Sequence, residues 1–315
     1  MAALDCGTNS TRLLIVGADG AVLERQMRIT RLGEAVDASH KLSADAIGRT
    51  VAVLEEYRTL MDRHGVVRAR LVATSAARDA VNAEEFFSAA RDATGVRPEL
   101  LSGLEEGRLS FAGATASLPA DIRRNRTALV VDIGGGSTEL VAGVPPVDTG
   151  DDATADVVAV SLDIGCVRLT ERFFHHDPPL ERELADAGDV VGAEVRRAVD
   201  ELPAMDGAEL LIGLAGTVST VASLEIGLPR YERARIHHAV LSRDQVDLWL
   251  RRLSTEDRRA RLERPGMVAG RADVIVGGVV VLAAVMAGFG LGECLVSEDD
   301  ILDGLVGSLR EPGPR

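Results

Sequence analysis

Asp-Ile-Gly-Gly-Gly-Ser-Thr-Glu, at residues 132–139, is the stretch that indicates most about the fold and chemistry of this chain. It lies between two apolar runs, so it predicts a turn between two strands. Three consecutive glycines in such a turn let backbone N–H groups surround an anion closely. A glycine triplet alone would fit an ordinary hairpin, but acid, glycines and hydroxyls together favour a phosphate-binding loop with a divalent cation. The candidate phosphate ligands are Gly134, Gly135, Gly136, Ser137 and Thr138, and the candidate metal ligands are Asp132 and Glu139.

A second motif of the same kind stands near the N-terminus. Residues 5–12 read Asp-Cys-Gly-Thr-Asn-Ser-Thr-Arg and also lie between two apolar strands. The single glycine allows a tight turn, and the three residues after it offer successive side-chain donors. Two such loops from opposed domains would bind one phosphate from both sides. The candidate phosphate ligands here are Thr8, Asn9 and Ser10, and Asp5 is a further candidate metal ligand.

The two motifs open two similar successions of strands and helices. Apolar alternation and glycine-containing turns predict three strands, a helix over 43–64, a strand at 71–74 and a helix over 83–94. The pattern restarts with a strand at 128–132. A repeated βββαβα pattern predicts an α/β protein in which two similar domains face each other across a cleft.

Composition excludes several classes of function. The formal charge is −14, and Lys41 is the only lysine, in none of the contexts that a P-loop, a protein kinase or a Schiff-base enzyme requires. An acidic chain is also a poor nucleic-acid binder.

The uncharged run at 274–292 is close to membrane-spanning length, but its glycines favour a buried helix followed by a short strand. Three widely spaced cysteines and a strand-like N-terminus without room for a signal peptide predict a cytoplasmic protein.

Taken together, the motifs resemble the exopolyphosphatase / guanosine pentaphosphate phosphatase family, within the actin-like, sugar-kinase and heat-shock ATPase superfold. The resemblance implies two ribonuclease-H-like (actin-like ATPase) domains, at 1–121 and 122–299, with a C-terminal helix over about 300–312 that packs back on the first domain. The matching segments occur in the order of the family and cover nearly the whole chain: 5–15, 73–80, 102–111, 132–141, 165–169, 214–220 and 296–305.

The activity implied by this resemblance is hydrolysis of the terminal phosphate of inorganic polyphosphate, dependent on Mg²⁺ or Mn²⁺. Longer members carry an additional C-terminal helical domain, whereas this chain ends soon after Leu305, so short polyphosphates are the expected substrates. A homodimer with a role in the stringent response is also expected. The alternatives are hydrolysis of guanosine pentaphosphate, a phosphotransferase or kinase activity, and a catalytically silent polyphosphate sensor.

The resemblance also assigns roles to individual residues. It makes Arg78 a phosphate ligand, although an arginine at this position can equally pair with Asp79 or Glu84. It makes Glu106 the catalytic base, with Glu105 as the second choice; from the residues alone, both are ordinary acids at a helix N-terminus. Mutual repulsion of the two acids would raise the pKa of one. Possible cleft contacts are Gly216 and Thr217.

Positive charge is concentrated in one part of the chain. Residues 230–264 hold ten arginines against six acids, which suggests a track for polyphosphate or, alternatively, amphipathic helices with solvated arginines. The neighbouring pair His237 and His238 is expected to point in different directions, which favours a structural or substrate-contact role over a metal site.

Overall fold

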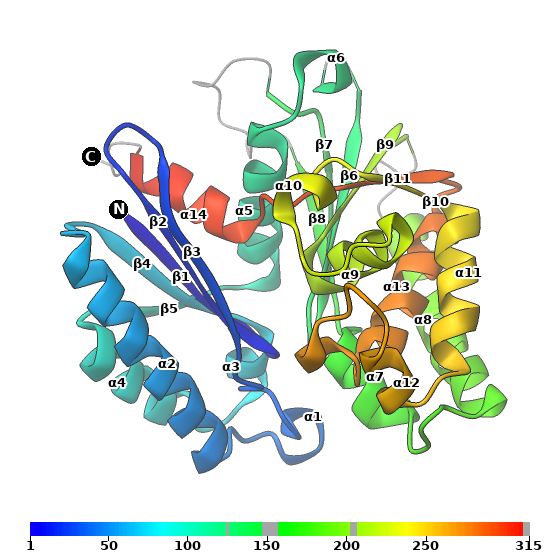
Figure 1. Cartoon of the computed structure of the whole chain (residues 1–315), viewed down its shortest axis with the longest axis horizontal. Coiled ribbons are helices and arrows are strands. Elements are labelled where there is room, and N and C mark those ends of the chain that lie inside the picture. The colour runs from blue at the N-terminus through cyan, green and yellow to red at the C-terminus, as the bar shows by residue number, and fades with distance from the viewer. Residues whose placement is uncertain (124–125, 147–156, 202–206, 311–315) are drawn as a thin grey trace.

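Two β-sheets form the two lobes of the molecule (Figure 1). The computed structural model describes residues 1–123, 126–146, 157–201 and 207–310. The first sheet has the strand order β3-β2-β1-β4-β5, and the second has the order β10-β11-β9-β6-β7-β8. The first-lobe strands are β1 (Ala2–Cys6), β2 (Ser10–Val16), β3 (Val22–Ile29), β4 (Ala69–Ala73) and β5 (Pro98–Leu100). The second-lobe strands are β6 (Ala128–Ile133), β7 (Thr138–Gly143), β8 (Val158–Leu162), β9 (Leu210–Leu214), β10 (Val240–Ser242) and β11 (Glu293–Val296).

The predicted repeat is present in the pairing of these strands. In each lobe three consecutive strands form an antiparallel meander, and the next strand along the chain pairs in parallel with the first. The two motif aspartates occupy equivalent places, because Asp5 lies opposite Arg12 across β1 and β2, and Asp132 lies opposite Glu139 across β6 and β7. The α/β fold of two similar lobes predicted from the sequence is therefore confirmed.

Helices cover the outer faces of both sheets. The first lobe carries α1 (Val36–Ser39), α2 (Ala44–Arg63), α3 (Ser75–Asp79) and α4 (Ala83–Thr94). As expected, α2 starts at an N-cap serine, Ser43, whose side chain accepts a hydrogen bond from Ala46 N. The second lobe carries α6 (Ala120–Arg123), α7 (Cys166–Phe173), α8 (Glu181–Glu201), α9 (Ala215–Ile226), α10 (Arg233–Ile236), α11 (Arg243–Ser254), α12 (Arg258–Leu262) and α13 (Ile275–Gly288).

The apolar segment at 274–292 forms the buried helix α13 and leads into strand β11. Its glycines allow close packing, since a Cβ on Gly278 would lie 2.0 Å from Thr217 Oγ1 and one on Gly277 would lie 2.9 Å from Cys166 O. The helix therefore lies directly behind Thr217 and Cys166. No helix in the described residues is long and apolar enough to cross a membrane.

Two helices cross between the lobes. Helix α5 (Gly103–Ala116) packs Phe111 and Ala114 against the second sheet, whereas α14 (Ile301–Arg310), from the far end of the chain, packs against β1 and β2. At the crossing, a Cβ on Gly113 would lie 1.9 Å from Asp300 O, and one on Gly304 would lie 2.1 Å from Leu109 O. Glycine at both places lets the helix backbones touch. The C-terminal helix expected over about 300–312 is described as far as Arg310, and the acidic loop expected at 145–156 falls mostly outside the described residues.

Candidate active site

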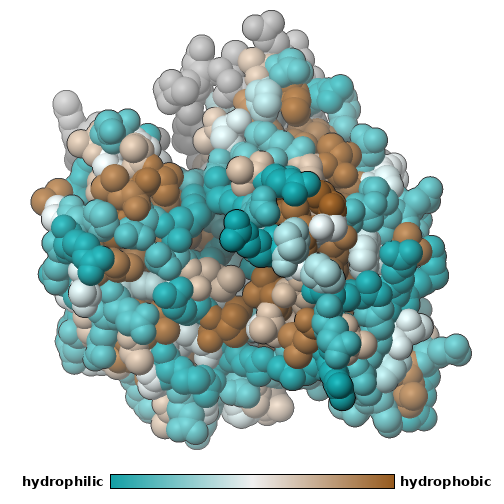
Figure 2. Space-filling view, viewed as in Figure 1, coloured by the Kyte–Doolittle hydropathy of each residue, from teal (hydrophilic) through white to brown (hydrophobic). Residues whose placement is uncertain are grey.

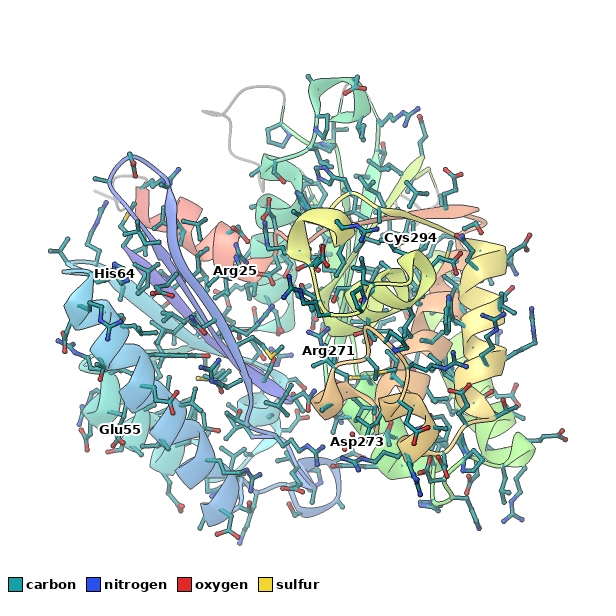
Figure 3. The ribbon with its side chains drawn as sticks, viewed as in Figure 1. Arg25, Glu55, His64, Arg271, Asp273 and Cys294 are labelled. Carbon is teal, nitrogen blue, oxygen red and sulfur yellow. The ribbon has the colours of Figure 1, made fainter. Side chains whose placement is uncertain are left out.

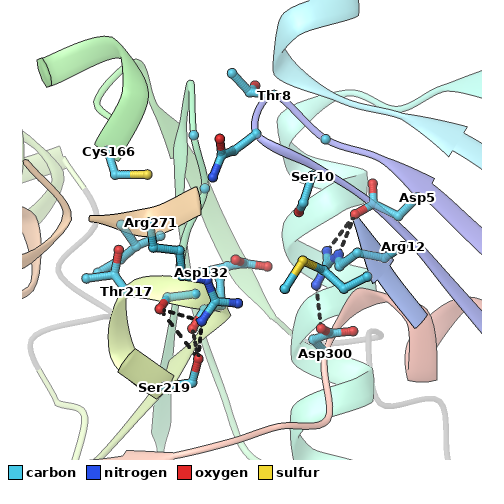
Figure 4. A pocket seen from close by; sticks show the side chains of 18 of the residues that line it. Asp5, Thr8, Ser10, Arg12, Asp132, Cys166, Thr217, Ser219, Arg271 and Asp300 are labelled. Carbon is cyan, nitrogen blue, oxygen red and sulfur yellow. Dashed lines mark hydrogen bonds and ion pairs between the residues drawn. The ribbon is translucent and has the colours of Figure 1, made fainter. Parts of the chain in front are cut away.

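A cavity of about 360 Å³ lies between the lobes, where the loops after β1 and β6 meet. Figure 2 shows the molecule hollowed near the middle of one face, with hydrophilic side chains at the rim. Figure 4 shows the same place from close by, with side chains of both lobes turned toward one another. The walls include most of the residues that the sequence predicts for the site: Asp5, Thr8, Asn9, Ser10, Glu106, Asp132, Gly134, Gly135, Gly136, Ser137, Gly216 and Thr217.

The two glycine-containing loops touch across the cleft. A Cβ on Gly135 would lie 2.8 Å from Thr8 Cβ, and one on Gly136 would lie 2.4 Å from Ser75 Oγ. Each loop is closed by one short backbone hydrogen bond, from Gly134 N to Ser137 O and from Gly7 N to Ser10 O. Within the described part of the chain, the remaining loop N–H groups of Thr8, Asn9, Gly135 and Gly136 have no acceptor. Unpaired N–H groups from both lobes therefore converge on one place, which is the geometry of an anion site.

Adjacent glutamates at the start of α5 have different environments. Glu105 completes a capping box, because its Oε2 accepts from Ser102 N at 2.9 Å while Ser102 Oγ accepts from Glu105 N. It is exposed and does not line the cavity. Glu106, one residue later on the helix, turns into the cavity with only 12% of its side chain exposed. Burial raises the pKa of Glu106 to about 7, opposed by Arg78. The cause is burial rather than the repulsion from Glu105 that the sequence suggested.

Arg78 lies behind Glu106 and is not part of the cavity wall. Its Nη1 donates to Glu106 Oε2 at 2.7 Å and to Leu101 O at 3.0 Å, and its Nη2 donates to Ser137 Oγ at 3.3 Å. Neither of the alternative partners, Asp79 and Glu84, is paired with it in the described residues. The guanidinium thus connects the acid on α5 to the glycine-containing loop after β6.

Thr138 and Glu139 also face away from the cavity. The Thr138 hydroxyl is fully buried and donates to Ile164 O. Glu139 is 1% exposed, accepts from Ser161 Oγ at 2.8 Å, and lies 3.9 Å from Arg78 Nη2. Burial, together with the neighbouring Glu106 and Asp132, raises the pKa of Glu139 well above its usual range. In this structure Thr138 fixes the loop backbone, and Glu139 sits in a layer behind the site.

Two aspartates with incomplete hydrogen bonding remain at the cavity floor. Asp132 Oδ2 accepts from Ser110 Oγ at 2.6 Å, and burial raises the pKa of Asp132 to about 6. Asp5 Oδ2 accepts from Arg12 Nε at 2.9 Å and from Nη2 at 2.6 Å. The other Asp5 oxygen, Oδ1, is buried and has no hydrogen-bond partner among the described residues. A buried acceptor without a donor is expected to have a cation or water as its ligand.

The donor set fits a magnesium ion better than a metal held entirely by protein. No group of three or more His, Cys, Asp or Glu side chains converges as a metal site in the described residues. Magnesium normally takes only one or two carboxylates and completes its shell with water and substrate phosphate oxygens. Asp132 and Asp5 satisfy that requirement, whereas Glu139 faces Ser161.

Across the cavity, the start of α9 forms the opposite wall. Arg271 Nη1 donates to Gly216 O at 3.0 Å, Thr220 Oγ1 at 3.0 Å and Ser219 Oγ at 3.2 Å, as Figure 4 shows in part. Thr217 is 4% exposed and packs against α13. Gly216 and Thr217 therefore line the cleft, as the sequence suggested, through a wall that Arg271 holds in place.

With this geometry described, comparison with known proteins is informative. The model of the Ppx/GppA phosphatase family matches residues 16–309. The chain belongs to this family. Exopolyphosphatase 2 of Mycobacterium tuberculosis (strain H37Rv) is 40% identical over 98% of both chains. The crystal structure of the Aquifex aeolicus Ppx/GppA family member is 32% identical, covers 98% of this chain and 96% of its own, and has a TM-score of 0.78. An exopolyphosphatase from Cytophaga hutchinsonii, 24% identical over 98% of this chain and 96% of its own, has the same fold with a TM-score of 0.85.

Several residues in the site of this Ppx/GppA protein were not predicted from the sequence. Arg12 stands at the end of the motif at 5–12, Ser110 lies one helical turn after Glu106, and Asp300 lies within a matching segment at 296–305. The signal for Ser110 was its i+4 spacing from Glu106, which places both on one helix face. For Asp300 the signal was three consecutive acids at 298–300, whose partner could not be named before the fold was known.

The arginine-rich segment does not form the wall of the cleft. Of its ten arginines only Arg233 lines the cavity. Arg261 is 3% exposed and donates to backbone oxygens, and Arg252 and Arg264 lie over the ring of Trp249. Seven of the ten are exposed, so the track remains a prediction: Arg230, Arg235, Arg243, Arg251, Arg252, Arg258 and Arg259.

The two neighbouring histidines do not point apart as expected. Their rings stack at 3.7 Å, because His238 has a positive φ of 64° outside regular structure. His237 Nδ1 accepts from Glu298 N at 3.0 Å, and burial lowers the pKa of His237 to about 4. These contacts describe a structural role.

Proposed function

We propose that this Ppx/GppA protein is an exopolyphosphatase, which hydrolyses the terminal phosphoanhydride bond of inorganic polyphosphate. The single observation that carries this proposal is Glu106, a carboxylate with a pKa near 7 at the wall of a cavity into which unpaired loop N–H groups converge. A base poised near neutral pH and a preformed anion site are the two parts that phosphoanhydride hydrolysis requires.

The phosphate loops would hold the terminal phosphoryl group. Thr8, Asn9 and Ser10 approach from the first lobe, and the glycines at 134–136 approach from the second. Their N–H groups are fixed by the strands before and after them, so they need no reorganisation as charge develops on the phosphoryl oxygens. Ser137 is held by Arg78 at the edge of the same loop.

Magnesium would be held by Asp132 and Asp5 together with substrate oxygens, and it supplies neutralisation of phosphate charge when bound. Ser110 orients Asp132, and Arg12 orients Asp5. Because each aspartate has one oxygen engaged by such a partner, the other is available to a ligand. Glu139 is a less direct candidate, since its oxygens face Ser161 and Arg78.

Glu106 would orient the attacking water and accept its proton as the bond to the leaving phosphate oxygen breaks. Arg78 holds the Glu106 carboxylate at one oxygen, Oε2, and so fixes its direction. The proton that Glu106 accepts balances the negative charge that passes to the shortened polyphosphate. Glu105 takes no part in this step because it is committed to the helix cap.

The decisive experiment measures phosphate release from polyphosphates of defined length, with and without Mg²⁺, by the wild type and by Glu106→Gln. The wild type should release phosphate only with the metal present, and the variant should lose at least a hundredfold in kcat while still binding substrate. Wild-type inactivity on every chain length would overturn the proposal. Guanosine pentaphosphate belongs in the same assay, and faster release from it than from polyphosphate would reassign the substrate.

We also propose a cellular location, an oligomeric state and a physiological role for the enzyme. Free, buried Cys6, Cys166 and Cys294 suit a reducing cytoplasm. A homodimer and a role in the stringent response follow from the family resemblance, and light scattering on the purified chain tests the former.

A further inference from the structure

Among the residues that the structure describes, four arginines line the cavity, and three of them already hold a carboxylate from one short segment of the chain. Arg12, Arg25 and Arg233 are these three, while the fourth, Arg271, donates to neutral oxygens. The carboxylates are those of Asp299 and Asp300, just before α14, and of Asp303, in its first turn.

The pairing is specific and spans both lobes of the cavity wall. Arg12 Nη1 donates to Asp300 Oδ2 at 2.5 Å, as Figure 4 shows, and Arg25 Nη2 donates to Asp303 Oδ1 at 2.5 Å. Arg233 Nη2 donates to an oxygen of Asp299. Figure 3 shows Arg25 beside α14 and Arg271 across the cleft. Each of these three cations thus pairs with an acid of residues 299–303, and Arg12 also donates to Asp5.

These acids are held rigidly. Asp300 Oδ1 accepts from Leu302 N at 2.9 Å, and Asp300 N donates to Asp303 Oδ2 at 2.9 Å, which together cap the start of α14. The Asp300 carbonyl is also pressed against Gly113 of α5. Their side chains are only 13% to 21% exposed, so water screens the ion pairs weakly. The carboxylates are fixed parts of the cavity wall.

A polyphosphate that enters this cavity therefore meets three arginines, Arg12, Arg25 and Arg233, whose charge is already balanced. Binding energy that the substrate and transition state share equally does not raise kcat, and it slows departure of a polyanionic product. Resting on the exopolyphosphatase function proposed above, we propose that Asp299, Asp300 and Asp303 act as an internal counter-anion that weakens the hold of the cleft on polyphosphate. These three residues determine the affinity of the cavity for polyphosphate without touching the reacting phosphoryl group.

The test compares equilibrium binding of inorganic tripolyphosphate to Glu106→Gln and to the same protein carrying Asp300→Asn. Asparagine keeps an oxygen for the Leu302 N–H, so the helix cap is preserved while one charge is removed. We expect the Kd to fall about threefold to tenfold, and the difference to shrink as salt is raised. Asp62→Asn is the matched control, since it removes the same charge from an exposed pair with Arg58 far from the cavity.

An unchanged or higher Kd in Asp300→Asn, or an equal fall in the Asp62→Asn control, would overturn the inference. If Asp300→Asn fails to fold, Asp299→Asn decides in its place, because Asp299 pairs with Arg233 and does not cap α14. Hydrolysis by the wild type is measured in parallel. An active wild type with unaltered binding in the variants rejects only the counter-anion, whereas an inactive wild type rejects the proposed function itself.

Discussion

Arg78 and Glu106 are joined by a 2.7 Å hydrogen bond from Nη1 to Oε2, and this contact connects the start of helix α5 to the short helix α3 that follows β4. The arginine comes from α3 and the glutamate from α5, and each is mostly shielded from water. Their pairing holds the carboxylate that we propose as base at the cavity wall, and it opposes the rise in its pKa that burial causes.

Removal of this arginine should therefore move the pH dependence of the reaction. In Arg78→Met, loss of the positive charge raises the pKa of Glu106 further, so the acid limb of kcat/KM should shift upward by about one pH unit or more. Rates at neutral pH should fall accordingly and partly recover at higher pH. An unshifted acid limb with lowered activity would assign Arg78 to substrate binding instead. Arg78→Lys, which keeps the charge, should shift the limb less.

The wild type should itself show a rising pH profile. Glu106 has a pKa of about 7 and acts as a base only when it has lost its proton. Below that pKa, kcat/KM should rise about tenfold per pH unit, and above it the rate should level off. Steady-state rates on tripolyphosphate from pH 5 to 9 check this, with saturating metal. A flat profile across that range would exclude Glu106 as the titrating base.

Glu105 and Glu106 should respond in opposite ways to substitution. Glu105→Ala breaks the capping box with Ser102, so we expect a loss of about 1 kcal/mol in the free energy of unfolding and near-normal kcat. Glu106→Gln should do the reverse, with activity lost and stability kept or raised, since a buried charge is removed. Urea unfolding and phosphate release measure the two properties separately. Strong inactivation by Glu105→Ala in a folded protein would contradict the assignment.

Gly135 should be intolerant of a side chain. An added Cβ would lie 2.8 Å from Thr8 Cβ, so Gly135→Ala must push the two phosphate loops apart. We expect a large loss of kcat/KM with the fold intact. Gly48→Ala is the control, because that helical position has no heavy atom within 4 Å of the new Cβ. It should stabilise the protein by about 0.5–1 kcal/mol and leave activity unchanged. Similar activity in both variants would show that the loops need not touch.

Ser110 should influence metal binding. Its hydroxyl donates to Asp132 at 2.6 Å in a fully buried setting, and loss of such a partner behind a ligand typically weakens metal affinity about tenfold to a hundredfold. Ser110→Ala should therefore bind Mn²⁺ more weakly by electron paramagnetic resonance and need more Mg²⁺ for half-maximal rate. Ser308→Ala, near the end of α14 beside Arg70 and outside the cavity lining, should do neither. Unaltered Mn²⁺ affinity in Ser110→Ala would remove Asp132 from the ligand set.

Much of this molecule follows from local sequence. The two loops at 5–10 and 132–139, the helix with its Ser43 cap and the buried helix at 275–288 could all be predicted, because strand alternation, capping residues and glycine turns act over a few neighbouring residues. The repeat of the strand pattern was also enough to predict two facing lobes. The family motifs then indicated that the polar residues of both loops contribute to one site.

Only the tertiary structure decided which polar groups meet. Arg12 and Asp300 are 288 residues apart, and nothing in either neighbourhood predicts their ion pair. The sequence does not distinguish the adjacent glutamates 105 and 106. In the folded helix, Glu105 forms the capping box with Ser102, whereas Glu106 points into the cavity. Burial, which sets the pKa of Glu106, is a property of everything packed around it. The sequence by itself determined the elements and the two glycine-containing loops, whereas long-range packing determined the charges that those loops face.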